Sequence, residues 1–425
     1  MLSLNILHVN FSSYKGGAAR AVYRLNEALN RNKLFSSKIL AAEHNNNCKE
    51  FISFPRHEKI INFFKRHFCV LIQKIEKLNK KSTSPFSYNY FSSKFLVKFI
   101  NDYKNFDIIH LHWVNGEILS IKDIGKISSL NLPVVWTFHD MWPFSGAEHI
   151  SISHKKWING YELESFFDLD ARTWLRKKKY WRNCIQVIAP SLWMKNCVMD
   201  SKLMKNWPIT VIPNTIDTGV WKPKSKYKLR NKLKINNDIK IILFSAMGGG
   251  NQYHKGKDLL IKALKNLKKK INFEIIVVGE NFSQSLSKLK LKTYYLGYIN
   301  NDKVLCDIYN CADVCVIPSR VENFCLTALE AQSCGIPVVS FNTCGQKDVI
   351  VDKKTGFLAD SFDHQDLEKK ILLILRNKKI HKFMSGNARN QVLKKFSYNK
   401  VVKKYVELYK KIKNIHENKI SGYIE

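Results

Sequence analysis

Short apolar segments alternate along the chain with longer segments in which apolar residues recur every three or four positions. The first apolar run is "LNILHVN" (4–10), and further runs occupy 106–114, 132–140, 184–191 and 209–217. Runs of this length predict buried β-strands, and the periodic segments between them predict helices. Strands that alternate with helices are typical of a parallel sheet covered by helices on both faces.

The alternation is interrupted once and then resumes. A polar, proline-containing segment at 220–228 precedes a strand and glycine-rich loop at 239–256 and an amphipathic helix at 258–269. Four more runs predict strands: "FEIIVVGE", "KTYYLGYI", "ADVCVIPS" and "GIPVVSFN". We therefore predict an α/β fold with two doubly wound, Rossmann-like domains facing a cleft. The predicted domains are 1–218 and 219–395, and 396–425 is predicted to be a helix that crosses back to the first domain.

Glycine and histidine residues follow predicted strands in the first half. Gly16 and Gly17 lie in a strand-to-helix turn, and His112 and the pair His139–Asp140 follow two later strands. Ligands of parallel sheets bind beyond these strand ends, and a glycine at a helix N-terminus lets an anion approach the backbone. A plain tight turn explains the two glycines equally well. His110 and His112 could bind a metal, but no third ligand is apparent, so we predict no metal site.

Two carboxylates flank a predicted helix start in the second half. Glu322 lies in the loop after a strand, and Glu330 lies about two turns inside the helix of "RVENFCLTALEAQS". The first-turn amides between them have no partners within the helix and suit a phosphate. Carboxylates that accept hydroxyl hydrogen bonds on either side of an anion site fit a nucleotide-sugar. For this stretch taken alone, the alternative to a ligand site is that the two glutamates only cap a helix and lie on its solvent-exposed face.

Several segments together resemble the retaining GT-B glycosyltransferases of family four, the "glycosyltransferases group 1" set. The Glu-x7-Glu spacing before "AQSCGIPVV" resembles the donor-site motif of that family. "PVVWTFHDMWPFSG" resembles an element of a subgroup from bacterial surface-polysaccharide gene clusters. "KGGAARAVYRL", "VIPNTID", "HKGKDLLIKAL", "TGFLAD" and "FSYNKVVKKYVELY" also match, so the resemblance covers nearly the whole chain.

The resemblance implies a donor site in the second domain and an acceptor site in the first. Glu330 would bind the donor ribose, Glu322 the transferred sugar, and Lys255 the diphosphate. The implied catalytic residues are His139, beside the reacting sugar, with Lys255 and Glu322. The remaining implied contacts are the donor-binding Gly16, Gly17, Asn323, Phe324, Cys325 and Leu326, and the acceptor-side His112 and Asp140.

The function that the resemblance implies is transfer of a sugar, with retention, from a nucleotide-sugar to a glycan. The acceptor would be lipid-linked and the product an O-antigen, capsule or exopolysaccharide. No cofactor and no metal are expected, because the lysine and the helix dipole would stabilise the leaving phosphate. Two departures concern the phosphate loop: Cys325 replaces a common glycine, and Gly249 stands where an arginine is common. The alternatives are a nucleotide-sugar hydrolase and a basic nucleic-acid-binding protein.

Charge raises the question of an anionic partner. The chain has 70 Lys+Arg and 35 Asp+Glu, a formal charge of +35, but these residues are dispersed. No motif with interleaved aromatic residues is visible, so nucleic acid is not an expected partner. In 57–81, an apolar stripe is bordered by lysines; such a helix can lie on an anionic membrane or pack on its own domain. The stripe is formed by Ile60, Phe63, Phe64, Phe68, Leu71, Ile72, Ile75 and Leu78.

The beginning of the chain and the cysteines bear on localisation. "LNILHVN" follows Met1 almost directly, without the pattern of a signal peptide, and no apolar run approaches the length of a spanning helix. Ten scattered cysteines without a CxxC pair indicate reduced thiols. We expect a cytoplasmic protein that is peripheral on the inner face of the membrane.

Overall fold

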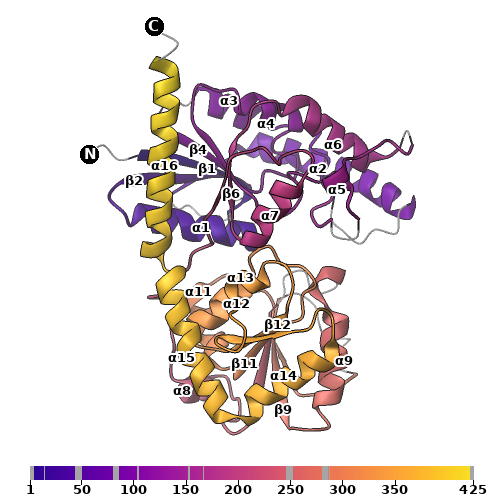
Figure 1. Cartoon of the computed structure of the whole chain (residues 1–425), viewed down its shortest axis with the longest axis vertical. Coiled ribbons are helices and arrows are strands. Elements are labelled where there is room, and N and C mark those ends of the chain that lie inside the picture. Colours follow the sequence, from indigo (N-terminus) through magenta and orange to yellow (C-terminus); the bar gives the residue numbers. More distant parts are fainter. Residues whose placement is uncertain are drawn as a thin grey trace. The chain divides into compact units, whose positions relative to one another are not determined.

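The chain forms two compact units in a computed structural model (Figure 1). Unit 1 comprises Met1–Pro213 and Val401–Glu425, and unit 2 comprises Asn214–Lys400. Both predicted domain boundaries, 218/219 and 395/396, fall inside unit 2 near its ends. The predicted cleft between the halves stays a prediction. The structure describes residues 4–13, 15–43, 50–79, 86–102, 105–151, 154–165, 167–245, 252–279, 286 and 288–421.

Unit 1 is built on a seven-stranded parallel sheet with the order β3-β2-β1-β4-β5-β6-β7. The five strands predicted here are confirmed, whereas β2 and β3 were not predicted. Leu7 and Val9 of β1 point into the main core, whereas His8 lies on the opposite face. The strands are β1 (Leu4–Ser12), β2 (Phe35–Glu43), β3 (Phe51–Ser53), β4 (Ile108–Leu111), β5 (Val134–Thr137), β6 (Gln186–Ala189) and β7 (Ile209–Val211).

Helices follow most of these strands, as expected for a doubly wound unit. They are α1 (Gly17–Asn30), α2 (Arg56–Asn79), α3 (Lys94–Asp102), α4 (Ile121–Ile127), α5 (Lys156–Asn159), α6 (Leu169–Tyr180) and α7 (Leu192–Asp200). The side chains of Leu96, Ile124 and Trp174, from α3, α4 and α6, share the main core with the strands. The core therefore fixes the loops that leave the carboxyl ends of β4 and β5.

Unit 2 has a six-stranded parallel sheet with the order β10-β9-β8-β11-β12-β13. Successive residues of β8 enter opposite cores: Leu243 packs with α11 and α12, and Ile242 with α9 and α14. The strands are β8 (Lys240–Ser245), β9 (Phe273–Val278), β10 (Thr293–Tyr295), β11 (Val314–Ile317), β12 (Val338–Phe341) and β13 (Gly356–Ala359). The helices are α8 (Lys226–Lys232), η2 (Tyr253–Lys255), α9 (Lys257–Leu267), α11 (Asp302–Asn310), α12 (Leu326–Ser333), α13 (Gln346–Val349), α14 (His364–Arg376) and α15 (Lys378–Lys395).

The last helix, α16 (Tyr398–Ser421), packs on unit 1 from Val401 onward. The Tyr409 hydroxyl and His110 Nδ1 are 2.7 Å apart, and Lys413 Nζ lies 2.7 Å from a carboxylate oxygen of Asp107. The predicted apolar face is buried at Tyr398, Val401, Val402, Tyr405, Leu408 and Tyr409. This helix therefore covers the sheet face on which His110 lies.

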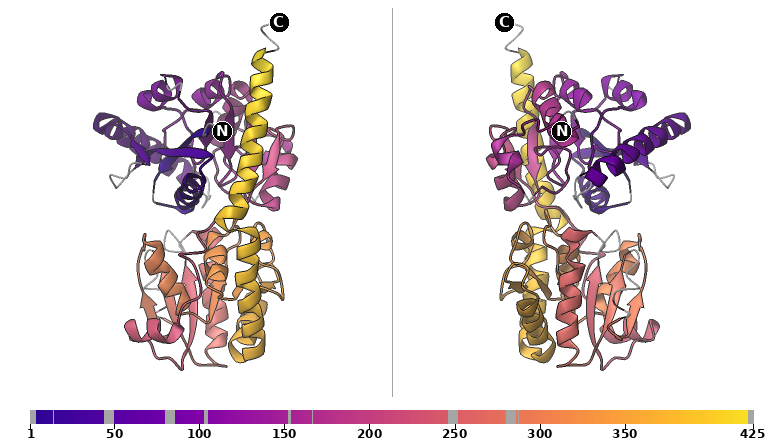
Figure 2. Two further views of the ribbon diagram at one scale, coloured as in Figure 1. Left: turned by 90° about the vertical axis from the view of Figure 1, so that its left-hand side faces the viewer. Right: turned by 90° about the vertical axis from the view of Figure 1, so that its right-hand side faces the viewer.

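Helix α2 lies at the periphery of unit 1 in both views of Figure 2. Its inward face is partly polar: Glu58 accepts hydrogen bonds from the Ser93 hydroxyl and the Phe95 amide, and Asn62 is buried. The phenylalanines of the predicted stripe point outward instead, with Phe63, Phe64 and Phe68 exposed by 53%, 66% and 54%. The hypothesis that this stripe packs on its own domain is therefore wrong for most of its length.

Part of the stripe cannot be placed in this way. The side chains of Ile75, Lys77 and Leu78 are not described, and Lys80 and Lys81 lie outside the described residues. Within the described ranges, no helix has both the length and the apolar character needed to cross a membrane.

Candidate functional site

Unit 2 brings Lys255 and Glu322 together from segments 67 residues apart. Lys255 ends the short helix η2 before α9, and Glu322 lies in the loop between β11 and α12. Lys255 Nζ donates to Glu322 Oε1 over 2.8 Å, and both side chains are mostly buried. Two of the three residues predicted to be catalytic therefore form one ion pair.

This pair keeps its charges despite burial. Burial favours the neutral form of Lys255, but the Glu322 carboxylate outweighs it and raises the pKa of the lysine. Burial likewise opposes ionisation of Glu322, yet Lys255 lowers the pKa of this carboxyl. Nearby His254 has a pKa lowered to about 4 by burial and by the Lys255 charge, so it is neutral near pH 7. The charged groups here are one ammonium and one carboxylate.

Arg320 fixes the two loops that carry this pair. Its guanidinium binds both carboxylate oxygens of Asp258 in α9 at 2.8 and 2.7 Å, and its amide donates to the His254 carbonyl over 2.7 Å. Gly256 lies so close to the β11 end that an added Cβ would be 1.8 Å from the Pro318 carbonyl oxygen. Only glycine fits there, which explains the Lys-Gly pair at this turn.

The loop before α12 has a backbone that explains the glycine common in the resembling family. Cys325, the N-cap of α12, has φ 52° and ψ 71°, a left-handed conformation that glycine adopts without strain. The amides of Cys325, Leu326 and Thr327 donate to no backbone carbonyl of the described residues. They form the positive end of the α12 dipole. The α12 start therefore has the donors that an anion needs.

The other predicted donor residues contribute differently. Phe324 is buried and packs against Phe396, so only its backbone is free to face a ligand. The Asn323 side chain is partly buried, and the Glu322 carbonyl beside it accepts from the Gly345 amide over 2.9 Å. Glu330 is buried inside α12 and accepts a 2.9 Å hydrogen bond from the Tyr309 hydroxyl. Its predicted role at the ribose stays a prediction.

In unit 1, Gly16 and Gly17 form the start of α1, as predicted. Gly16 is the N-cap with φ 108°, and an added Cβ would meet nothing within 4 Å, so the space beside it is open. Gly17 is the first residue of the helix. The turn therefore offers an approachable helix N-terminus, and its predicted role in donor binding stays a prediction.

His112 and His139 belong to a line of buried imidazoles. His112 Nδ1 lies 3.1 Å from His139 Nε2, and His112 Nε2 lies 2.9 Å from His8 Nδ1. His112 is 3% exposed, and of this pair only His139 is partly buried rather than buried. The predicted place of His112 on the acceptor side stays a prediction. Burial lowers the pKa of His139 to about 4 and that of His8 to about 3. These rings are neutral hydrogen-bonding groups near pH 7.

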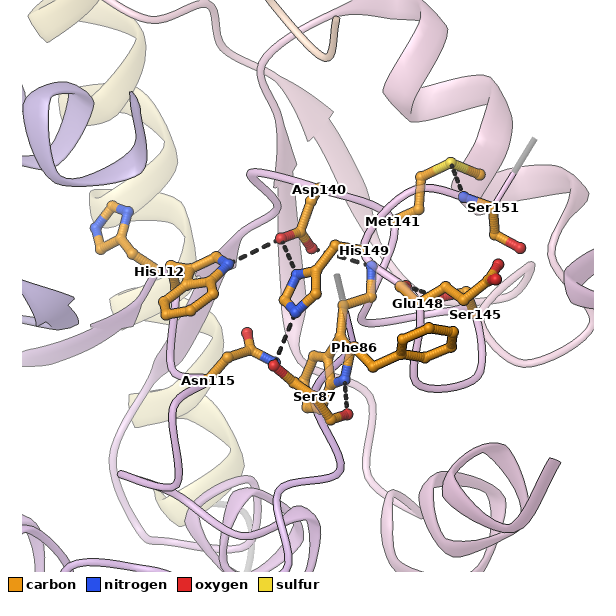
Figure 3. Close-up of polar contacts among 12 residues, drawn as sticks. Phe86, Ser87, His112, Asn115, Asp140, Met141, Ser145, Glu148, His149 and Ser151 are labelled. Carbon is orange, nitrogen blue, oxygen red and sulfur yellow. Dashed lines mark hydrogen bonds and ion pairs between the residues drawn. The ribbon is translucent and has the colours of Figure 1, made fainter. Parts of the chain in front are cut away.

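Asp140 begins a second polar network, drawn in Figure 3. Its carboxylate accepts from the Trp113 indole over 2.8 Å and lies 2.6 Å from His149 Nδ1. The other nitrogen of His149 lies 2.8 Å from the Ser87 hydroxyl. Burial opposes ionisation of Asp140, but His149 and the hydrogen bonds from His149 and the indole lower its pKa. Asp140 is therefore an ionised, fixed acceptor.

Lys177 holds the loop that contains this network, and it was not among the residues predicted from the sequence. Its buried Nζ donates to the carbonyls of Trp142, Ser145 and Gly146 and lies 3.8 Å from the centre of the Trp142 ring. Trp142 itself is fully buried and belongs to the core of unit 1. The sequence signal for Lys177 is that a basic residue continues the spacing of the buried Ala171 and Trp174 in α6.

Three of these histidines could also be metal ligands. His8, His110 and His112 have ring nitrogens within 4.8 Å of one another, so the third ligand that seemed to be missing is His8. However, the two nitrogens of His110 already lie 2.7 Å from the Tyr409 and Thr137 hydroxyls. The residues are neutral imidazoles of the right type, but their nitrogens are mostly engaged in hydrogen bonds.

Gly249, which stands where the resembling family commonly has an arginine, lies outside the described residues.

Comparisons with known proteins agree with this arrangement of two units. The sequence profile "Glycosyltransferase Family 4" matches residues 15–220, and "Glycosyl transferases group 1" matches residues 225–391. The chain is 25% identical to an uncharacterized 41.2 kDa protein in the cps region of Klebsiella pneumoniae, over 96% of this chain and 99% of that protein. It is 25% identical to the lipopolysaccharide 1,2-N-acetylglucosaminetransferase of Salmonella typhimurium, over 54% of this chain and 62% of that enzyme.

A solved structure supports the same fold. The Anabaena protein HepE, in complex with UDP and glucose, superposes with a TM-score of 0.65 at 17% identity. The superposition covers 96% of this chain and 100% of HepE. Together with the two parallel sheets, this likeness establishes the GT-B fold that the sequence predicted.

Proposed function

Because this chain belongs to the family 4, group 1 glycosyltransferases, we propose that it transfers a sugar with retention from a nucleotide-sugar to a glycan acceptor. The cps-region and lipopolysaccharide relatives support a role in surface-polysaccharide synthesis. HepE binds UDP and glucose, which supports a nucleotide-sugar as the donor. We further propose a lipid-linked acceptor and a reaction that requires no metal and no cofactor.

The Lys255–Glu322 ion pair beside the α12 amides is the observation that carries this proposal. Departure of a nucleoside diphosphate builds negative charge on its outer phosphate. A fixed ammonium and unpaired helix amides stabilise such charge without having to reorganise during the reaction. Glu322 holds the ammonium in place and can accept hydrogen bonds from sugar hydroxyls. The site therefore suits a phosphate leaving group better than a glycosidase mechanism, which needs an acid and a nucleophile flanking the bond.

The proposed reaction is a front-face displacement. The bond between the anomeric carbon and the phosphate oxygen breaks, and the acceptor hydroxyl oxygen bonds to the same face of that carbon. The acceptor proton passes to the departing phosphate. In this scheme the Glu330 carboxylate binds ribose hydroxyls, and His139 contacts the reacting sugar. Exclusion of water favours transfer over hydrolysis.

A donor screen tests this proposal. Thermal shift of the full chain would be measured with UDP-, GDP-, ADP- and dTDP-sugars, and we expect one nucleotide class to stabilise the folded protein. Transfer from that donor to a glycan would then be followed by product analysis. Free sugar formed in place of a glycoside would indicate a nucleotide-sugar hydrolase. Absence of any nucleotide effect, with salt-sensitive binding of DNA or RNA, would favour the nucleic-acid alternative.

We also propose that α2 places this enzyme on an anionic membrane surface. Its exposed apolar residues form a continuous outward face, and its exposed or partly exposed basic residues border that face. Apolar side chains that enter the acyl boundary and cations that meet anionic headgroups are the two contributions such helices use. The apolar residues are Ile60, Ile61, Phe63, Phe64, Phe68 and Leu71, and the basic residues are Arg56, Lys59 and Lys74. Lys65 and Arg66 instead bind the Ser92 carbonyl and the Glu43 carboxylate of the same unit.

Vesicle sedimentation tests this placement. The chain should sediment with vesicles containing phosphatidylserine more than with phosphatidylcholine alone. Replacing Phe63, Phe64 and Phe68 by serine should reduce sedimentation severalfold. The control is Phe383→Ser, because Phe383 of α15 is equally exposed, at 58%, but lies outside the proposed surface. Equal sedimentation of the triple variant and the wild type would overturn the proposal.

A further inference from the structure

A hydrogen-bonded row of three histidines connects the interior of unit 1 to His139. His8 lies in the middle of β1, His112 directly after β4, and His139 two residues after β5. The nitrogen distances are 2.9 Å between His8 and His112 and 3.1 Å between His112 and His139. His8 and His112 are 0% and 3% exposed. The row therefore ends in the core at His8 and at a partly buried ring at His139.

A neutral imidazole has one nitrogen that donates and one that accepts. Burial lowers the pKa of each ring in the row, so all three are neutral near pH 7. The protons can then be arranged in only two ways. Either each Nδ1–H of His8 and His112 donates toward His139, or each Nε2–H of His139 and His112 donates toward His8. The choice sets which nitrogen of His139 carries its proton.

The free end of the row decides between these arrangements. His8 Nε2 is buried and has no hydrogen-bond partner among the described residues. When donation runs toward His8, this nitrogen carries an N–H that nothing accepts. When donation runs toward His139, it is only an unused acceptor. Buried N–H groups without a partner are rarer in proteins than buried acceptors without one.

We infer that His112, backed by His8, is a positioning residue that holds His139 in the tautomer with its proton on Nδ1. His139 Nε2 then accepts from His112, and His139 Nδ1–H is left as a donor. Within the described residues this nitrogen has no partner, so the donor is available to an oxygen of a ligand. Naming that oxygen as one of the sugar donor rests on the proposed function; the tautomer itself does not.

Metal binding is the competing use of the same rings. A metal takes one nitrogen from each of His8, His110 and His112. His110 would then lose one of its two hydroxyl contacts, and His112 would lose its contact with His8 or with His139. Only His8 Nε2 is free to bind without such a loss. The hydrogen-bonded row therefore accounts for more of the observed geometry.

Nitrogen-15 NMR of the ligand-free, full-length chain labelled at histidine tests the inference. Proton–nitrogen correlations distinguish a protonated ring nitrogen from a bare one. We expect protonated Nδ1 and bare Nε2 at His8, His112 and His139. A His139 ring protonated at Nε2 would overturn the inference, and this measurement needs no variant. Because no nucleotide-sugar is added, the result is independent of whether the proposed function holds.

Two leucine variants separate positioning from packing. His112→Leu removes the donor to His139 Nε2, so His139 should show both tautomers in exchange. His110→Leu is the matched control, because His110 is equally buried, two residues earlier in β4, but lies outside the row. That variant should keep the wild-type His139 tautomer. A single unchanged tautomer in His112→Leu would contradict the positioning role. Stoichiometric Zn²⁺ that shifts His8, His110 and His112 together would assign a metal site in place of the row.

Discussion

The two units bury polar groups at their strand ends in opposite ways. In unit 2, Lys255 and Glu322 stay charged, because each offsets the burial of the other. In unit 1, His8, His112 and His139 lose their charge, because burial lowers the pKa of each ring and no carboxylate of the described residues is hydrogen-bonded to this row. A retained charge can stabilise a developing phosphate anion, whereas a neutral row can only direct hydrogen bonds.

This difference divides the proposed work between the units. Unit 2 has the electrostatic elements: an ammonium, a carboxylate and the α12 amides. Unit 1 has rings and an Asp140 carboxylate whose orientations are fixed by neighbours such as His149 and Trp113. Substitutions in unit 2 should therefore act mainly on the rate and on donor binding. Substitutions in unit 1 should act mainly on proton placement and pH dependence.

The largest effect is expected from Lys255→Ala. Loss of the ammonium removes the fixed positive charge at the phosphate, and kcat for transfer should fall at least about 100-fold. The control is Lys262→Ala, which removes an equal charge from the exposed face of α9 and should leave kcat unchanged. Circular dichroism would verify that both variants fold. Full activity in Lys255→Ala would show that the retained charge has no part in catalysis.

Donor binding should be weakened by Glu330→Ala. If this carboxylate accepts ribose hydroxyls, its loss should raise the Kd of the donor about 10- to 100-fold, as expected for hydrogen bonds to a charged group. The matched control is Tyr309→Phe, which removes only the hydroxyl that donates to Glu330. That control should change Kd no more than about fivefold. Equal effects of the two variants, measured by calorimetry, would reduce Glu330 to a structural role.

Much of the fold follows from the apolar pattern, because most strands with two buried faces are made mainly of apolar residues, such as "VCVI" in β11. β2 was missed because "FSSKILAAE" begins with polar residues, and only its second half is fully buried. β3 and β13, of three and four residues, were also missed. The outward direction of the α2 phenylalanines was not predictable either. It depends on Glu58 finding partners at Ser93 and Phe95, more than thirty residues later.

The sites were predicted as residues but not as networks. Glu322 and Lys255 were singled out separately, and their ion pair required the fold to close a gap of 67 residues. His8 was overlooked, because a histidine inside "LNILHVN" looks like any core position. Its register opposite His110 makes it a neighbour of His112. Sequence patterns identify residue types at strand ends, whereas hydrogen-bond direction requires the neighbouring strands.

The neutrality of the buried histidines in unit 1 can be tested through the pH dependence of the unfolding free energy. The pKa of His8 falls from 6.5 to about 3 on folding, so between these values the unfolded chain binds a proton that the native protein excludes. Stability should therefore fall as pH decreases below 6.5. His8 contributes up to about 1.4 kcal/mol per pH unit to this slope.

His8→Asn removes that contribution. The slope of the unfolding free energy between pH 6 and 5, from urea titrations, should be about 1 kcal/mol per pH unit shallower than in the wild type. His57→Asn, at an exposed position of α2, serves as the control and should keep the wild-type slope. An unchanged slope in His8→Asn would mean that burial does not exclude the proton from this ring.

The smallest effect concerns the backbone of Cys325, which positions the α12 amides. Its φ of 52° is strained for a side chain but not for glycine. Both Cys325→Ala and Cys325→Gly lose the buried thiol, so their difference isolates the backbone. The glycine variant should be more stable by about 1 kcal/mol, although glycine also loses more entropy on folding. At Cys315, in the extended strand β11, the order should reverse, with alanine more stable. If alanine were more stable than glycine at both positions, the left-handed turn at Cys325 would impose no strain. Cysteine could then replace glycine there without destabilising the loop that carries the α12 amides.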